Sequence, residues 1–216
     1  MNIEEFAADL ADMCSRSPIA EGRPLTWTLI ANPKAGGFTI KKRWRRHRQI
    51  LRLYAEKARH NPVRSAWSGP SRTAREADCG NGSLGAMGLV PTRHPAHAGE
   101  LVSKLLDEAE AMRHEAETKG TPAPFHLVIT AGGDGTSLEA LTALYHAPAA
   151  LKSSFAVLRL PMGTGNDGAD SRELDKALDL LVNPTRVEFT PAVRLRTSYP
   201  EKGPFLAFNI LSIGLD

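Results

Sequence analysis

Three glycine-rich segments, each directly after a short apolar run, constrain the fold of this chain more than any other feature. They are "ANPKAGG" at residues 31–37, "GGDGT" at 132–136 and "LPMGTGND" at 160–167. The apolar runs before them have the length of buried strands and lie at residues 25–31, 125–131 and 155–160. Loops of this kind at strand ends leave backbone amides open to a ligand, so we expect a binding site at one sheet edge.

Helical periodicity separates these runs. One apolar stripe recurs at helical spacing, at Ile40, Trp44, His47, Leu51, Tyr54 and Ala58. Further helices are expected at residues 97–118 and 137–147, and a further short strand at 87–91. The repeated order of strand and helix predicts an α/β fold with a mostly parallel sheet covered by helices.

Composition sets limits on function. The chain has 216 residues, of which 42% are hydrophobic and 24% charged, enough for one core and the start of a second unit. A net charge of +3 does not by itself require a nucleic-acid partner, and none is expected. Cys14 and Cys79 form no CxxC pair, which favours reduced thiols. The acidic N-terminus and the lack of a long apolar stretch predict a cytoplasmic protein.

The chain divides into three predicted parts. Residues 1–24 form a docking helix and linker, in which Ile3, Phe6, Leu10 and Met13 share one face and pack on the domain or on a second copy in a homodimer. Residues 25–184 form the main domain, with a surface insertion at 61–88 that is rich in Gly, Ser and Pro. Residues 185–216 begin a second, β-rich domain.

The loop residues suggest phosphate binding, although each loop also has a structural explanation. Lys34 supplies a positive charge, but "ANPKAGG" alone could be an ordinary turn. The glycines of "GGDGT" free amides at a helix start, and Asp134 among such amides implies Mg²⁺ between it and the phosphates. The alternative is that Asp134 only caps the helix. Thr164, Asn166 and Asp167 add polar groups at the same rim.

The three segments, in this order and spacing, resemble the catalytic domain of the diacylglycerol kinase family, the lipid kinases that include sphingosine and ceramide kinases. "PTRHPAHAGEL" at 91–101, "TRVEFTPAVRL" at 185–195 and "FNILSIGLD" at 208–216 extend the similarity. The resemblance covers residues 25–216 apart from the insertion. It implies the nucleotide-binding fold that this family shares with NAD kinases.

The resemblance also implies site residues. The predicted ATP contacts are Asn32, Pro33, Lys34, Ala35, Gly36, Thr92, Gly133, Asp134, Gly135, Thr136, Ser137, Leu138, Glu139, Thr164 and Asn166. Of these, Asn166 is included because of its place in the third loop and not because of the resemblance. The predicted metal ligands are Asp134, Asp167 and Glu188, and Asp134 is also the predicted catalytic residue. The chain departs from the family at Ala35, where a hydroxyl is common, at Glu188, usually Asp, and at Gly168 and Asp170, usually an apolar residue and Arg.

The expected activity is an ATP- and Mg²⁺-dependent lipid kinase that transfers the γ-phosphoryl group to a lipid hydroxyl, with diacylglycerol as acceptor. The family's general base is a glutamate expected beyond Asp216, so the 216-residue chain alone is expected to transfer almost no phosphate. One alternative is an NAD kinase, which shares "GGDGT" but for which an Asn-Glu pair is expected in place of "PMGTGND". The other alternative is a nucleotide-binding regulatory module without catalysis.

Two further expectations concern single features. In "KKRWRRHR" at residues 41–48, Trp44 is predicted to be core, while the basic residues form either a solvated face or a contact with anionic lipid at a membrane surface. His97 is predicted to begin a helix near Thr92 rather than to bind a metal, because no partner stands at ligand spacing.

Overall fold

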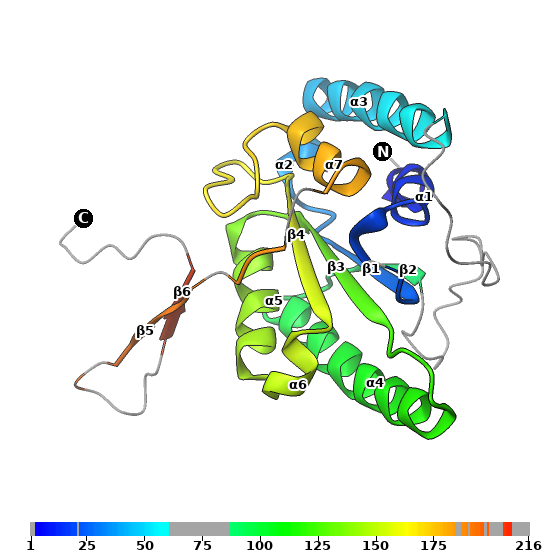
Figure 1. Cartoon of the computed structure of the whole chain (residues 1–216). Coiled ribbons are helices and arrows are strands. Elements are labelled where there is room, and N and C mark those ends of the chain that lie inside the picture. The colour runs from blue at the N-terminus through cyan, green and yellow to red at the C-terminus, as the bar shows by residue number, and fades with distance from the viewer. Residues whose placement is uncertain are drawn as a thin grey trace.

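Four parallel strands form the centre of the protein. They are β1 (Leu25–Ala31), β2 (Met87–Pro91), β3 (Phe125–Gly132) and β4 (Phe155–Pro161), in the order β2-β1-β3-β4 (Figure 1). The computed structural model describes residues 3–20, 22–60, 87–184, 187–189, 191–196, 198 and 205–208. The predicted insertion lies outside the described residues, except that its last two positions begin β2. The predicted α/β fold with a mostly parallel sheet is confirmed.

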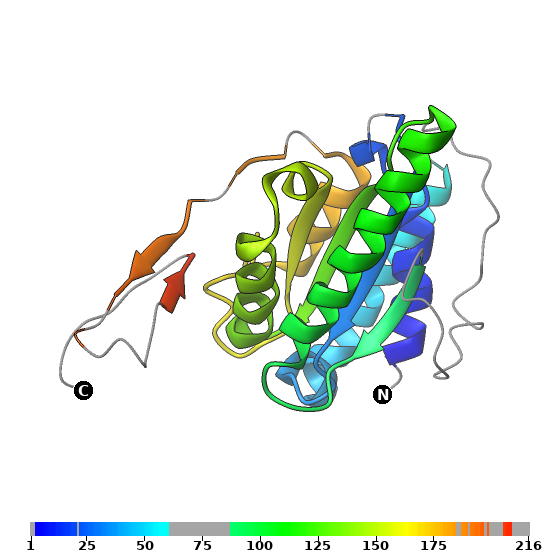
Figure 2. The same ribbon diagram turned by 90° about the horizontal axis from the view of Figure 1, so that it is seen from below.

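Helices cover both faces of the sheet, as Figure 2 shows. One face carries α1 (Ile3–Cys14), α2 (Gly36–Thr39), α3 (Lys41–His60) and α7 (Leu174–Val182). The other face carries α4 (His97–Lys119), α5 (Asp134–His146) and α6 (Ala149–Lys152). A short 3-10 helix at Pro18–Ala20 joins α1 to β1. Helix α7 was not predicted, and α5 begins three residues before the predicted start at 137.

The strands are buried because apolar side chains alternate between the two layers of helices. In β1, Trp27 and Leu29 pack in the core with α1, α3 and α7, whereas Ile30 packs with α4 and α5. In β3, Ile129 packs on the side of α1, α3 and α7, and Val128 packs on the side of α4 and α5. Residues that point to one face of a strand are two apart, so every position of a central strand meets a helix layer.

Helix α1 packs against the sheet of the same chain. Phe6, Leu10 and Met13 are at most 1% exposed, and the Phe6 ring lies 5.2 Å from Phe38 and 6.2 Å from Trp44 between ring centroids. Trp44 is 6% exposed, which confirms it as a core residue of α3. The predicted apolar face of the N-terminal helix is thus buried within its own chain.

Near the C-terminus, β5 (Val193–Leu195) and β6 (Phe205–Ala207) pair as a small antiparallel sheet. Most of the predicted second domain, residues 185–216, lies outside the described residues. In the described part of the chain, no helix has both the length and the apolar character that crossing a membrane requires.

The connections place a crevice at the carboxyl edge of the sheet. After β1 the chain forms α3 on one face of the sheet and then returns to β2, which lies beyond β1. After β3 it forms α5 on the opposite face and then returns to β4, which lies beyond β3. Neighbouring strands whose connections diverge in this way leave an opening between their loops, which is the usual ligand site of open α/β sheets. The three glycine loops follow β1, β3 and β4 at this edge.

At the opposite end of the sheet lies a buried titratable group, His126, which is the second residue of β3 and is 9% exposed. Its ring stacks on Phe155 at 4.7 Å between centroids, and its Nδ1 lies 2.6 Å from Thr26 Oγ1. Burial lowers the pKa of His126 to about 4, and the positive charge of Arg23 adds to this effect. The native protein therefore holds this ring neutral.

This burial predicts a loss of stability in mild acid. Because an unfolded histidine titrates near pH 6.5, the unfolded chain binds a proton between about pH 6.5 and pH 4 that native His126 does not bind. The stability from the neutral ring is complete above that interval and is lost as pH falls through it, by about 3 kcal/mol at most. Urea unfolding at a series of pH values measures this slope.

His126→Asn should remove most of the slope, whatever its effect on stability at neutral pH. The matched control is His114→Asn, because His114 is exposed on α4 and should leave the slope as in the wild type. An unchanged slope in His126→Asn would show that other groups cause the acid sensitivity.

Candidate functional site

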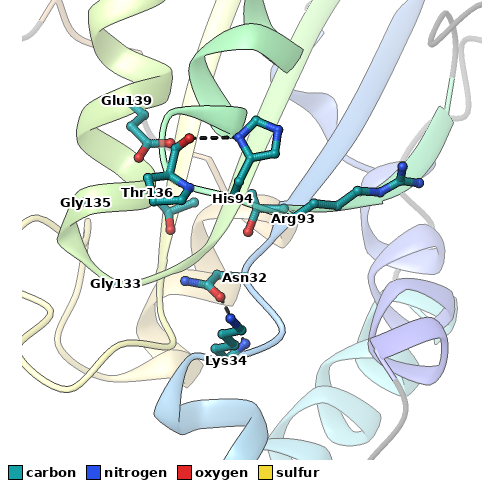
Figure 3. A pocket seen from close by; sticks show the side chains of 10 residues that line it. Asn32, Lys34, Arg93, His94, Gly133, Gly135, Thr136 and Glu139 are labelled. Carbon is teal, nitrogen blue, oxygen red and sulfur yellow. Dashed lines mark hydrogen bonds between the residues drawn. The ribbon is translucent and has the colours of Figure 1, made fainter.

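A cavity of about 370 Å³ lies at the carboxyl edge of β1, β2 and β3, where the sequence predicted a site. Its volume is within the range of small-molecule sites. Hydrogen bonds from the Asn32 amide to Ala131 O (2.9 Å) and from the Thr92 amide to Ala31 O (2.8 Å) hold the loops side by side. The lining residues, shown in Figure 3, are Asn32, Lys34, Thr92, Arg93, His94, Pro95, Gly133, Gly135, Thr136 and Glu139.

Some glycines of the loops are required because two backbones meet. A Cβ on Gly163 would lie 2.5 Å from Gly133 Cα, and a Cβ on Gly37 would lie 3.0 Å from Met162 O. The Gly37 amide donates to the same Met162 oxygen at 2.8 Å. The loops after β1, β3 and β4 are therefore packed directly against one another through their main chains.

Other glycines leave space at the cavity. A Cβ on Gly135 would have nothing within 4 Å, and one on Gly133 would meet only Gly163 Cα, at 3.8 Å. Gly133 is the N-cap of α5 and has no side chain to accept from the helix amides. The first amides of a helix have no carbonyl partner within it, and together with the helix dipole they attract an anion. The start of α5 can thus bind a phosphate.

The predicted contacts in α5 do not all face the cavity. Thr136 lines it and is 8% exposed. Ser137 points inward instead, where its hydroxyl lies 2.9 Å from the Thr130 hydroxyl. Leu138 is 42% exposed and is not among the lining residues. The sequence placed all three at the site, but a helix turns successive side chains in different directions.

The loop after β1 contributes a cation. Asn32 Oδ1 accepts from the Lys34 amide at 2.9 Å, which fixes the turn. Lys34 lines the cavity and is exposed, so its ammonium group can reach a bound anion. Arg93 also lines the cavity, but in Figure 3 its side chain runs away from Asn32 and Thr136. Lys34 is therefore the cation best placed to meet phosphates.

Glu139 is engaged by the protein itself. Its Oε1 accepts from the Ala96 amide at 2.9 Å and its Oε2 from the Ala98 amide at 3.2 Å. Ala96 has the left-handed backbone φ of 67°, which turns the chain into α4. The sequence predicted an ATP contact at Glu139, and the structure has it capping α4 from α5 while lining the cavity. No signal in the sequence indicates this long-range cap.

Asp134 links two glycine loops. Its Oδ1 accepts from the Gly168 amide at 2.7 Å, and its Oδ2 would lie 3.2 Å from a Cβ on Gly165. Asp167 Oδ2 would lie 3.9 Å from the same Cβ. The two carboxylates therefore both lie near the side of Gly165 on which a Cβ would stand. Mg²⁺ binds one or two carboxylates together with phosphates, so this pair fits the predicted metal.

The three predicted metal ligands do not gather in one place. Glu188 is exposed on the segment after α7, and within the described residues it forms no compact ligand group with Asp134 and Asp167. Such a group does occur at His94, His97 and Glu100, whose ligand atoms lie within 4.8 Å of one another.

This histidine group corrects one expectation. His97 was predicted to have no partner at ligand spacing, which is wrong because His94 and Glu100 lie beside it. The Arg93 amide donates to His97 Nδ1 at 3.0 Å, and burial lowers the pKa of His97. A neutral ring that accepts at Nδ1 has its proton on Nε2, which leaves no lone pair for a metal. The bond supports the predicted role of His97 at the helix start.

The third loop folds on its own polar groups. Asn166 has a positive φ of 61°, and its Oδ1 accepts from the Gly163 amide at 2.7 Å. Arg43 of α3 donates to Gly163 O at 3.2 Å. Thr164 is exposed, and its hydroxyl would lie 3.7 Å from a Cβ on Gly36 in the first loop. Thr164 therefore stands on the rim between two loops, whereas Asn166 shapes the loop.

An ion pair closes this loop. Asp170 accepts at Oδ2 from the Arg159 amide (2.7 Å) and at Oδ1 from Nε (3.0 Å) and Nη2 (2.6 Å) of the same arginine. The Asp170 amide donates back to Arg159 O at 3.1 Å. The side chains of Arg159 and Asp170 are 14% and 21% exposed. The acidic residue that departs from the family pattern is thus matched by an arginine on β4.

Removing this carboxylate should destabilise the protein. Asp170→Ala is expected to lower the free energy of unfolding by about 2 kcal/mol, because the largely buried Arg159 then loses its charge-assisted hydrogen bonds to this carboxylate. The control is Asp167→Ala in the same loop, whose ion pair with Arg172 is long, 3.6 Å, and joins side chains that are 57% and 86% exposed. That change should cost less than about 0.5 kcal/mol.

Denaturant unfolding without added metal measures both variants. Equal losses in Asp170→Ala and Asp167→Ala would contradict a special role for the Arg159 pair.

The comparison with protein families agrees with this geometry. The model of the diacylglycerol kinase catalytic domain matches residues 26–189, so the chain belongs to this family. The comparison with curated proteins found no match. Membership in the family indicates phosphoryl transfer of the kinase type.

Proposed function

We propose that this domain binds ATP with Mg²⁺ at the carboxyl edge of its sheet and transfers the γ-phosphoryl group to a lipid hydroxyl, with diacylglycerol as the acceptor. The observation that supports this most directly is that the glycine loops after β1 and β3 line one cavity at the positive end of α5, while the third glycine loop packs directly against both of them. Phosphoryl transfer depends chiefly on positioning and charge neutralisation, which such a rim can supply.

Each part of the rim has a task in this proposal. The amides at the start of α5 hold phosphate oxygens, and Lys34 neutralises charge from the loop after β1. Thr92 and the cavity wall after β2 receive the remainder of the nucleotide. Asp134 and Asp167 hold the metal, whose positive charge, when bound, offsets the negative charge of the phosphates.

The family match favours this proposal over an NAD kinase, the alternative that shares "GGDGT". A regulatory module that binds nucleotide without catalysis uses the same cavity, so only a transfer assay separates it from a kinase.

Asp134→Asn provides a test with a distinctive sign. The asparagine Oδ1 can still accept from the Gly168 amide, so the loops should keep their arrangement. With Mg²⁺ present, calorimetry should show ADP and ATP binding weakened by about tenfold or more, because a metal ligand is lost. With a chelator present, the variant should bind at least as tightly as the wild type, because a negative charge beside the phosphates is gone.

The matched control is Asp107→Asn, which removes the same charge from the exposed side of α4. It should bind nucleotide as the wild type does in both conditions. Wild-type protein that gives no heat of binding at millimolar nucleotide would overturn the proposed site.

The reaction is tested separately, by following labelled phosphate from ATP into diacylglycerol in mixed micelles. Any transfer should fall by at least ~10³-fold in Asp134→Asn, about 4 kcal/mol of transition-state stabilisation. Intact Mg-ATP binding without transfer to any lipid would instead support the regulatory module.

A further inference from the structure

The first half of α3 presents positive charge that forms no ion pair with the rest of the described chain. Lys41, Lys42, Arg45 and Arg46 are all exposed, and none forms an ion pair with another described residue. On a helical wheel these four positions fall on one side, whereas Trp44 faces the core. We call these four residues the basic patch.

The second half of the same helix is different. Arg48 and Arg52 both pair with Glu5 of α1, at 2.5 Å and 2.9 Å, and Arg59 pairs with Asp12. Lys57 pairs with Asp179 of α7 at 3.2 Å. These cations join α3 to its neighbouring helices. Within the part of the chain that the structure describes, the basic patch is therefore charge of α3 that remains for an external partner.

The position of the basic patch is unfavourable for the isolated domain. Lys41 and Lys42 begin α3, where the helix dipole is positive, and the first turn holds no acidic residue. Cations there interact unfavourably with the positive end of the helix dipole. Anionic groups bound at this end of the helix would remove the conflict.

Exposed apolar side chains accompany the patch. Ile40 directly precedes α3 and is 46% exposed, and Leu53 is 63% exposed one turn beyond Gln49. On the helical wheel Leu53 falls between Lys42 and Arg46, on the outward side. A surface that combines basic residues with isolated large apolar ones matches the interface of an anionic membrane, where headgroups meet acyl chains.

The patch also lies beside the candidate site. Arg43, between Lys42 and Trp44 in sequence, donates to Gly163 O in the third glycine loop. In Figure 1 the first turns of α3 stand at the end of the sheet where α2 lies, which is the carboxyl edge. A flat partner on the basic patch would therefore adjoin the third glycine loop, whose Gly163 packs against Gly133 of the cavity lining.

We propose that the basic patch, with Ile40 and Leu53, docks this protein on an anionic lipid bilayer with the cavity rim close to the membrane. This inference rests on the proposed lipid-kinase function only for the identity of the partner. The binding itself depends on charge and exposed apolar area, so it can be tested without any reaction.

The test is co-sedimentation with vesicles of phosphatidylcholine alone and of phosphatidylcholine mixed with phosphatidylserine. The wild type should bind the mixed vesicles, and this binding should weaken as salt shortens the Debye length. Since each basic residue at an anionic surface adds about fivefold in affinity, the combined change Lys41→Gln, Lys42→Gln, Arg45→Gln and Arg46→Gln should weaken binding by several hundredfold, on the order of 10³ at most.

A charge-matched control removes four other exposed cations, through Arg16→Gln, Lys104→Gln, Lys119→Gln and Lys176→Gln. It lowers the net charge equally and should bind the mixed vesicles within about threefold of the wild type if position matters more than total charge. Circular dichroism and nucleotide calorimetry on both variants should match the wild type, because none of the eight residues lines the cavity.

Three outcomes would overturn the inference. The patch variant and the control could lose vesicle binding equally, or the wild type could bind neutral vesicles as tightly as anionic ones. The third is that duplex DNA binds the patch more tightly than the vesicles do. Failure of the proposed function looks different, because vesicle binding would persist while nucleotide binding or transfer is absent.

Discussion

The parallel pairing of β1 with β3 is the constraint on which the site depends. Ala31 and Ala131 are in register at the last rungs of the ladder, so the loops that follow leave the sheet at the same height. Their connections then diverge to opposite faces, toward α3 and α5. Since the sheet core keeps this register, the glycine segments must approach each other even though about a hundred residues separate them in sequence.

Close main-chain contacts turn this proximity into a defined surface. Gly163 against Gly133, and Gly37 against Met162, leave no room for side chains between the loops. Gly135 has space around it instead. The same residue type therefore serves two purposes along this edge, packing of loop on loop and access to a ligand, and a glycine motif alone does not distinguish them.

Much of this arrangement could be predicted because it follows from local patterns. The four strands lie within one residue of their predicted bounds, since apolar runs bounded by turn residues indicate buried strands. Contacts between distant segments could not be predicted. Glu139 capping α4 and Asp170 pairing with Arg159 depend on the three-dimensional placement of helices and loops. The inward direction of the Ser137 side chain was not predicted either. The sequence analysis expected α5 to begin at residue 137, whereas the helix begins at Asp134 and already includes Ser137.

The cap made by Glu139 has a consequence for ligand polarity. Two helices, α4 and α5, begin at the cavity, and each has a positive end that would attract an anion. The end of α4 is already satisfied by the Glu139 carboxylate, whereas the cap of α5 is a glycine and the Asp134 carboxylate in its first turn accepts from the Gly168 amide. The cavity therefore attracts an anion more strongly at the start of α5 than at the start of α4. An elongated molecule with its negative charge at one end has a single favourable direction of entry, with that end at α5 and the other against the loop of Thr92 to Pro95.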